Sequence, residues 1–147
     1  MTEHFTFEEL TYTNHSDLLE ENRKEAKAFI KHLKYIAGTL EELRTLLGVP
    51  LKVTSGFRGY ALNKAVGGSP TSGHTKGLCA DIIPIGIAVD EAFKEILARR
   101  NECPSLRKCI FESVKNSVWL HIEAKVEKEQ TTLFYKTTDG RNYSAVS

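Results

Sequence analysis

The chain has 147 residues, of which 27% are charged, and nearly equal numbers of acidic and basic residues give a formal net charge of +1. This length is typical of one domain, so we predict a single domain over residues 1–147. The charges are spread along the chain without a basic stripe, so no nucleic-acid partner is expected. No apolar run approaches the length of a membrane span, so no membrane-spanning segment is expected.

The cysteines and the N-terminal residues indicate in which cellular compartment the protein is made. Cys79, Cys103 and Cys109 form an odd count without a CxxC spacing, which indicates free thiols in a reducing environment. The segment from Met1 to Phe5 has neither the basic nor the apolar region of a signal peptide. We therefore expect a protein that is cytoplasmic as synthesised. Nothing in the sequence indicates an oligomeric state.

The first third of the chain is predicted to be helical. Residues 1–17 give short and mixed signals, which favour a docked arm with one turn of helix. Apolar residues then recur at spacings of three and four over 18–47, which indicates an amphipathic helix with a break near Gly38. Gly48 and Pro50 end it, because glycine is favoured just past a helix end and proline cannot continue one.

The middle of the chain alternates between short elements and glycine-rich turns. Residues 51–54 are predicted to form a strand that delivers Arg58 to its end, and residues 61–66 a turn or two of helix. A continuous apolar strand is expected over 78–83, interrupted only by Asp81. A buried acid is costly unless it is paired or bound to a metal, so Asp81 is the strongest anomaly of the sequence.

The rest of the chain predicts one helix and two hairpins. The helix covers 90–99, and the first hairpin has strands over 108–113 and 118–124. The last hairpin, 131–137 with 141–146, is interpreted as scaffold. The expected fold class is α+β, with an antiparallel sheet that carries helices on one face and a cleft for the site on the other.

The register of the first hairpin separates its side chains into two faces. Symmetric pairing about the turn puts Glu112 opposite Trp119, and Ile110 opposite His121. The expected core face carries Cys109, Phe111, Val118, Leu120 and Ile122. The expected cleft floor carries Ile110, Glu112, Trp119, His121 and Glu123.

Three polar residues point to a metal site. His74 on a glycine-rich turn, Asp81 in a strand and His121 in another strand supply two nitrogens and one oxygen from separate elements. This is the ligand set of a catalytic zinc, which leaves one position open, and we predict one Zn²⁺ per chain. The alternative interpretation is a loop histidine, a turn cap and a strand histidine without metal. Cys79, on the face of Asp81, is either a fourth ligand or a small buried residue.

The motifs around these residues resemble a known family. A Ser-x-His-x-x-Gly-x-Ala-x-Asp stretch followed by Trp-x-His is matched by Ser72, His74, Gly77, Asp81, Trp119 and His121, with Cys79 where alanine is usual. The family has further motifs upstream of this stretch, and they are similar to Thr54 to Arg58, Asn63 and Val66 to Ser69. Over most of its length the chain is similar to the zinc D-Ala-D-Ala carboxypeptidase and L-alanyl-D-glutamate peptidase family. That family shares its fold with lysostaphin-type endopeptidases and the hedgehog signalling domain.

The resemblance implies roles for further residues. Arg58 would neutralise the oxyanion that develops on the scissile carbonyl, because a fixed guanidinium stabilises charge strongly where water is excluded. The alternative for Arg58 is a surface ion pair. Ser72 and Trp119 are candidates for substrate contact. Asn63 is a third, although it is favoured as a residue that holds its loop by hydrogen bonds.

The general base is ambiguous at the sequence level. Val118 and Trp119 occupy the positions before the last histidine where related enzymes often place an acid or a histidine. Glu112 is diagonal to His121 across the hairpin and is preferred, Glu123 is the second candidate, and a site without a base is the third interpretation.

These observations predict a zinc metallopeptidase that hydrolyses peptidoglycan stem peptides, of the D-Ala-D-Ala carboxypeptidase or endolysin type. A carboxylate would take the proton of the attacking water and return it to the leaving amine. One alternative is a zinc-containing module that binds a cell-wall peptide or a protein without cutting it, and another is a domain without metal. A phage-encoded enzyme released at lysis would explain how such a protein meets the wall.

Overall fold

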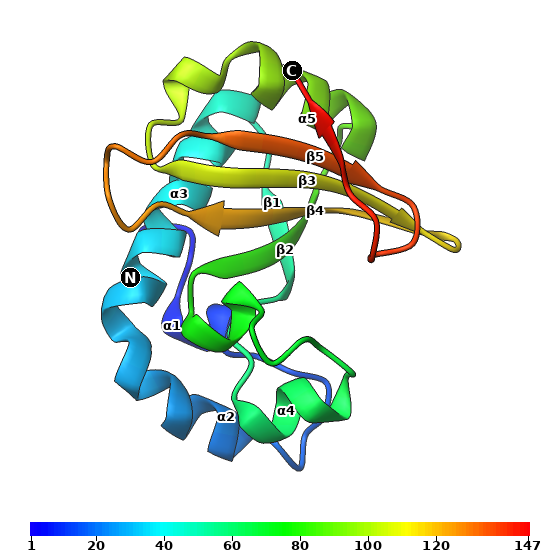
Figure 1. Ribbon diagram of the computed structural model, residues 1–147. Helices are drawn as coiled ribbons and strands as arrows, with labels where there is room; N and C mark the ends of the chain where they lie inside the picture. Colours follow the sequence, from blue (N-terminus) through cyan, green and yellow to red (C-terminus); the bar gives the residue numbers. More distant parts are fainter.

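The computed structural model describes all residues from Met1 to Ser147 and contains one six-stranded sheet with helices packed against it (Figure 1). The helical elements are α1 (Phe7–Leu10), α2 (Leu19–Ala26), η1 (Lys27–Phe29), α3 (Ile30–Leu47), α4 (Tyr60–Ala65), η2 (Gly73–Lys76), α5 (Val89–Ala98) and η3 (Arg100–Glu102). The strands are β1 (Leu51–Ser55), β2 (Cys79–Pro84), β3 (Leu106–Val114), β4 (Ser117–Ala124), β5 (Leu133–Thr137) and β6 (Ser144–Val146). The predicted α+β class is confirmed.

The sheet is mostly antiparallel, as predicted, but one parallel pair of strands makes it mixed. The strand order is β1-β2-β4-β3-β5-β6, and every neighbouring pair is antiparallel except β3 and β5. The link over residues 125–132 crosses the start of β3, so β5 joins the far edge of β3. Because β5 reverses the direction of β4, and β3 is antiparallel to β4, β5 has to run parallel to β3.

The long amphipathic segment is interrupted earlier than predicted. Gly38 lies inside α3, and the break falls at η1 instead. A helical glycine costs only about 1 kcal/mol relative to alanine, and the buried Ala37 and Leu40 beside it pack against the core. Tertiary packing therefore keeps α3 continuous, whereas η1 lets α2 and α3 turn towards different partners. Gly48 ends α3 in the left-handed conformation, with a φ of 69°, as its position predicted.

The central hairpin has the predicted register. Glu112 pairs with Trp119 and Ile110 with His121 across β3 and β4. On the core face, Cys109, Leu120 and Ile122 have no solvent exposure. Val118 departs from this pattern because it lies beside the hairpin turn, beyond the helices, and is 37% exposed.

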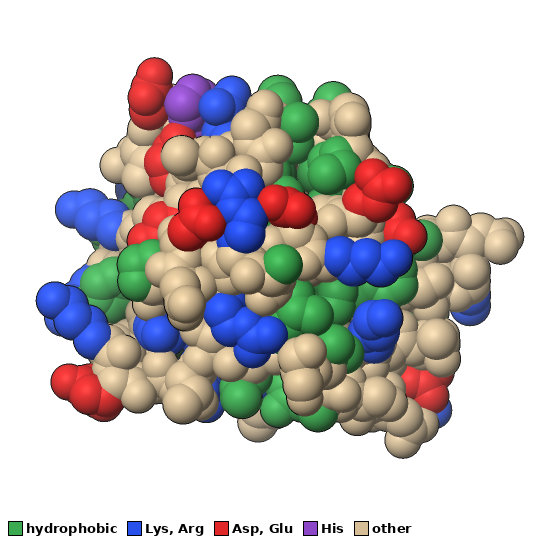
Figure 2. Space-filling model, turned by 90° about the horizontal axis from the view of Figure 1, so that it is seen from above, with side chains coloured by type: hydrophobic (Ala, Val, Ile, Leu, Met, Phe, Trp, Pro, Cys, Tyr) green, Lys and Arg blue, Asp and Glu red, His purple; other side chains and the backbone are tan.

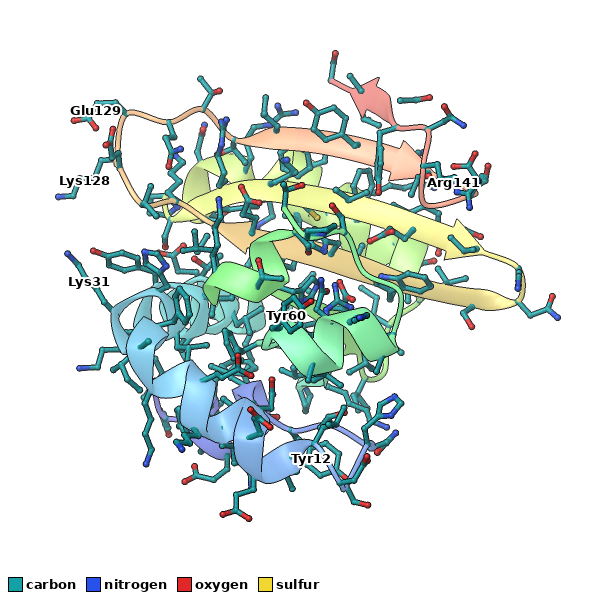
Figure 3. All side chains as sticks on the ribbon, turned by 60° about the horizontal axis from the view of Figure 1, so that its bottom comes forward. Tyr12, Lys31, Tyr60, Lys128, Glu129 and Arg141 are labelled. Atoms are coloured by element: carbon teal, nitrogen blue, oxygen red, sulfur yellow. The ribbon has the colours of Figure 1, made fainter.

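The helices cover the sheet unequally (Figure 1). The long helix α3 and α5 pack on one face, where most of the hydrophobic core lies. The shorter α1, α2 and α4 gather below the β2 end, and Figure 3 shows α4 with Tyr60 in front of the sheet there. None of the helices combines the length and apolar character that a membrane crossing requires.

The face above α5 carries side chains of both charges. Figure 2 shows Lys and Arg interspersed with Asp and Glu over this face, with hydrophobic side chains between them. Arg99 pairs with Glu95 at 3.1 Å and with Glu102 at 2.7 Å. Exposed pairs of this kind contribute little to stability, typically below about 1 kcal/mol each. The chemistry-bearing residues lie on the opposite side of the sheet.

Candidate metal centre

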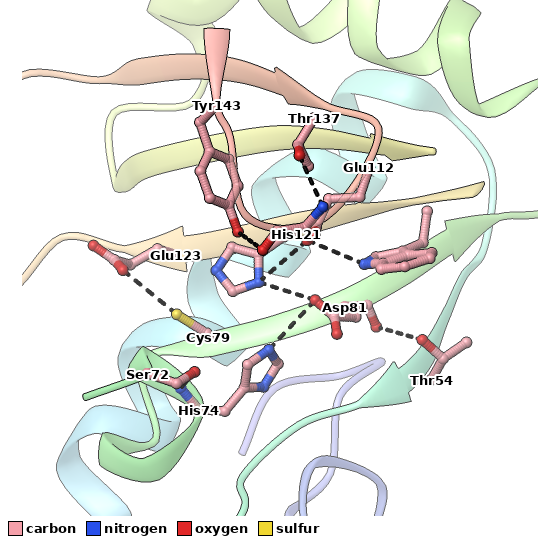
Figure 4. Close-up of polar contacts among 12 residues, drawn as sticks. Thr54, Ser72, His74, Cys79, Asp81, Glu112, His121, Glu123, Thr137 and Tyr143 are labelled. Carbon is pink, nitrogen blue, oxygen red and sulfur yellow. Dashed lines mark hydrogen bonds and ion pairs between the residues drawn. The ribbon is translucent and has the colours of Figure 1, made fainter. Parts of the chain in front are cut away.

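Sheet register brings Asp81 and His121 together. Asp81 of β2 pairs directly with His121 of β4, so both side chains leave the same face of the sheet. The distance from His121 Nδ1 to Asp81 Oδ1 is 3.0 Å. His74 comes from η2, and its Nε2 lies 3.4 Å from the same oxygen. The three ligand atoms lie within 4.8 Å of one another, with Asp81 between the two rings (Figure 4).

The ring of His74 is oriented by a hydrogen bond on its far side. His74 is only 2% exposed, and its Nδ1 lies 2.7 Å from the carbonyl oxygen of Gly56. A carbonyl only accepts, so Nδ1 carries a proton, and Nε2 is the nitrogen turned towards Asp81. This arrangement is the one found behind metal-ligating histidines.

The charges of the centre are interdependent. Burial would raise the pKa of Asp81, but His74 and His121 hold it well below its usual value. Burial would lower the pKa of His121, but its interactions with Asp81 and Cys79 outweigh that effect and raise it well above 6.5. Without metal, the centre therefore holds a carboxylate next to a protonated imidazole.

Glu112 lies on the same side of His121 as Asp81. Its Oε2 is 4.0 Å from His121 Nδ1, and it accepts a hydrogen bond of 3.2 Å from the indole Nε1 of Trp119. Burial raises the pKa of the Glu112 carboxyl above its usual value. Trp119 thus orients Glu112, a contact that follows from their direct pairing across the hairpin.

Glu123 lies at the other edge of the His121 ring. Its Oε1 is 3.5 Å from the Sγ of Cys79, which is 1% exposed. Cys79, His121 and Glu123 form a second group of ligand atoms within 4.8 Å of one another, which does not include His74 or Asp81. Cys79 is therefore not placed as a fourth member of the first group. A Cβ at Gly73 would lie 2.2 Å from this sulfur, so a larger residue there would force the Cys79 side chain or the loop to shift.

Arg58 is held by its neighbours in the chain. Asn22 Nδ2 donates to the carbonyl of Phe57, and Asn22 Oδ1 accepts from the backbone N–H of Gly59 at 2.7 Å. The N–H of Arg58 donates to the carbonyl of His74 at 3.0 Å. Sequence reasoning missed Asn22, because a buried asparagine in a polar helix gives no periodic signal.

The guanidinium of Arg58 is half-buried, and its Nε has no hydrogen-bond partner. Burial lowers the pKa of this group, while the charge of Asp81 works in the opposite direction. Arg58 lines a cavity of about 500 Å³ together with Tyr60, Asn63 and Gly68. Arg58 is therefore not a surface residue held in an ion pair, which was the alternative interpretation.

The other two loop candidates have structural contacts. Asn63 is buried, and its Nδ2 donates to the carbonyls of Gly68 and Ser69 at 3.3 and 3.0 Å. Ser72 caps η2, where its Oγ accepts from the N–H of His74 at 3.2 Å. Both residues fix the loop that carries His74, and Ser72 also lines the groove described next.

A groove of about 410 Å³ opens beside His121 and Glu123. The last hairpin, which the sequence analysis interpreted as scaffold, supplies Tyr135 and Tyr143 to its wall. Lys108 of β3 also lines it, with its Nζ 5.9 Å from the centre of the Tyr135 ring. The error arose because the parallel pairing of β5 with β3 was not predicted, and this pairing brings the hairpin to the site.

The donor set fits zinc. Two imidazole nitrogens and one carboxylate oxygen from different elements converge, and one of the rings is fixed in the required tautomer. His74, Asp81 and His121 would hold the ion, and zinc bound there would act as a Lewis acid on water and on a carbonyl.

Comparison with known proteins supports this assignment. A search of curated proteins found no match. The family described as Peptidase M15 matches residues 3–123, a stretch that includes all three ligand candidates. The resemblance inferred from the motifs is thereby confirmed. The chain belongs to the Peptidase M15 family, the zinc peptidases of D-Ala-D-Ala carboxypeptidase and hedgehog-like type, which hydrolyse peptide bonds.

Proposed function

We propose that this protein is a zinc-dependent peptidase that hydrolyses the stem peptides of peptidoglycan. The observation that carries the proposal is the convergence of His74 Nε2, Asp81 Oδ1 and His121 Nδ1 within 4.8 Å, in a chain of the Peptidase M15 family. Three protein ligands leave one position for water or substrate, as catalysis by zinc requires.

Two residues near the ligands have separate roles, one in proton transfer and one in stabilising charge. Glu112, 4.0 Å from His121 Nδ1, takes the proton of the attacking water and delivers it to the leaving amine. The hydrogen bond from Trp119 keeps its carboxyl turned to the centre. Arg58 stabilises the negative charge that develops on the carbonyl oxygen, since its Nε has no partner in the protein. Glu123 faces Cys79 instead, which favours Glu112 as the base.

The groove supports a peptide substrate with free carboxylates. Lys108 supplies a positive charge, while Tyr135 and Tyr143 supply flat surfaces with hydroxyl groups. Stem peptides carry several carboxylates and small D-residues, which such a groove can accept in an extended form. The D-Ala-D-Ala carboxypeptidase and endolysin types of cleavage both act on these peptides.

The test follows new amine groups released from purified muropeptides. Wild type loaded with zinc is expected to release amine, His74→Ala to lose activity together with the zinc ion that His74 ligates, and Glu112→Gln to keep that ion while its rate falls about 10²–10⁴-fold. Glu129→Gln, an exposed carboxylate at the far end of the β4–β5 loop (Figure 3), is the control and should match wild type.

The outcomes discriminate between the alternatives. Zinc bound in equal amount to protein without amine release from any muropeptide would favour a binding module. Absence of zinc binding would contradict both interpretations. Activity retained in Glu112→Gln would remove Glu112 as the base and leave the peptidase proposal standing.

We also propose that the protein is made in the cytoplasm and reaches the wall at lysis, as a phage-encoded enzyme would. Three free buried cysteines support folding in a reducing compartment. Fractionation of producing cells tests this proposal: wall cleavage should begin only after the membrane is permeabilised. Detection of the protein in the periplasm of intact cells would contradict it.

A further inference from the structure

Cys79 and Glu123 lie at the far edge of the His121 ring and have no role in the proposed mechanism. Cys79 of β2 pairs directly with Glu123 of β4, and His121 lies two residues before Glu123 on the same face. The three ligand atoms lie within 4.8 Å of one another. We propose that Cys79, His121 and Glu123 form a second divalent-cation site, distinct from the group of His74 and Asp81.

The geometry of the shared ring allows the two sites to coexist. His121 Nδ1 faces Asp81 at 3.0 Å, and Figure 4 shows the other ring nitrogen, Nε2, turned towards Cys79 and Glu123. An imidazole that has lost its remaining proton can ligate one ion through each nitrogen. Binding of the second ion after the first therefore releases two protons, one from the Cys79 thiol and one from the ring.

The surroundings of Cys79 are arranged for a sulfur ligand. Its Sγ contacts Glu123 Oε1 at 3.5 Å and lies directly under Gly73, where any Cβ would approach to 2.2 Å. The sulfur is thus fixed between the loop and the strand pair. The groove beside Gly73, His121 and Glu123 gives an ion access from solvent.

The ligand types determine which ions bind. One thiolate, one imidazole and one carboxylate favour borderline and soft divalent ions such as Zn²⁺, Co²⁺ and Cd²⁺ over Mg²⁺ and Ca²⁺. The first site has only nitrogen and oxygen ligands. A metal–thiolate signal is therefore specific for the second site.

Cobalt makes the test direct, because Co²⁺ bound to thiolate gives a near-ultraviolet charge-transfer band. Metal-free, reduced protein is titrated with Co²⁺ while absorption and bound metal by equilibrium dialysis are recorded. Wild type should bind about two ions per chain, with the thiolate band in proportion to one of them. Cys79→Ala should lose the band completely and bind about half as much metal, and Cys79→Ser provides a second variant of closer size.

Control variants separate this site from the rest of the protein. Cys103→Ala removes another buried thiol and should leave the band unchanged, whereas His74→Ala should lose the first ion and keep the band. Glu123→Gln should weaken the binding that the band reports. A titration without a thiolate band, a band that survives in Cys79→Ala, or a band that saturates with only one ion bound would each overturn the second site.

Discussion

The two faces of β2, β3 and β4 are built from alternating residues of the same strands, yet they differ in kind. On the helix side Leu120 and Ile122 have no exposure and join the main core, while on the other side His121 and Glu123 remain partly exposed. Side chains one residue apart thus enter opposite environments. Burial of the packed face therefore fixes the register of the strands, and this register determines which side chains reach the metal centre.

A change on the packed face tests this division most strongly. Leu120→Ala is expected to lower the free energy of unfolding by about 2–5 kcal/mol, because it leaves a cavity in a close-packed core. Urea unfolding measures this loss, and zinc content of the protein that remains folded should be unchanged. Val118→Ala, two residues earlier on the same strand but 37% exposed, should cost less than about 0.5 kcal/mol. Equal costs for the two variants would contradict the division into faces.

A substitution on the face that carries the metal centre should lower activity and leave stability nearly unchanged. Arg58→Ala is expected to lower kcat by about 10²–10³-fold, because one charged donor to the developing oxyanion is lost. Muropeptide hydrolysis gives kcat, and zinc content should stay at the wild-type value. The exposed Arg141, in the turn between β5 and β6 (Figure 3), serves as the control through Arg141→Ala. Normal kcat in Arg58→Ala would remove Arg58 from the mechanism.

Asn22 connects the two kinds of region, since it is buried and holds the segment that carries Arg58. Asn22→Ala is expected to cost about 1–3 kcal/mol of stability, because buried backbone groups lose their partners. It should also lower kcat at unchanged zinc content. The exposed Asn101 provides the control variant Asn101→Ala. Reduced stability with an unchanged kcat would mean that Asn22 supports the fold without positioning Arg58.

The smallest expected effect concerns protons at the metal. Burial opposes protonation of His121, but Asp81 and Cys79 raise its pKa well above 6.5, so the metal-free ring stays protonated at neutral pH. Zinc must displace that proton. The apparent affinity of the protein for zinc should therefore fall about tenfold per pH unit as the pH drops below the raised pKa of His121. Calorimetry in buffers of different ionisation enthalpy measures the proton release. No release at pH 7 would contradict the raised pKa.

Much of the site was predictable because its signals are local. Asp81 stands out as a costly acid in an apolar strand, and symmetric pairing about the turn between β3 and β4 gives the register that pairs Glu112 with Trp119. The family motifs then connected His74 with these strands. Contacts such as the Gly56 carbonyl on His74 Nδ1 were not predictable, because a backbone carbonyl leaves no trace in the sequence.

The α+β class, the register of the central hairpin and the three converging ligands could be predicted from the residues alone. The parallel pairing of β5 with β3, the lining of the groove by Tyr135 and Tyr143, and the contact of Cys79 with Glu123 became clear only in the folded chain. The two groups differ in the range of the interactions that set them. Periodicity reports which face of an element is buried, whereas the path of a connection and the neighbours across a sheet depend on the packing of the whole chain.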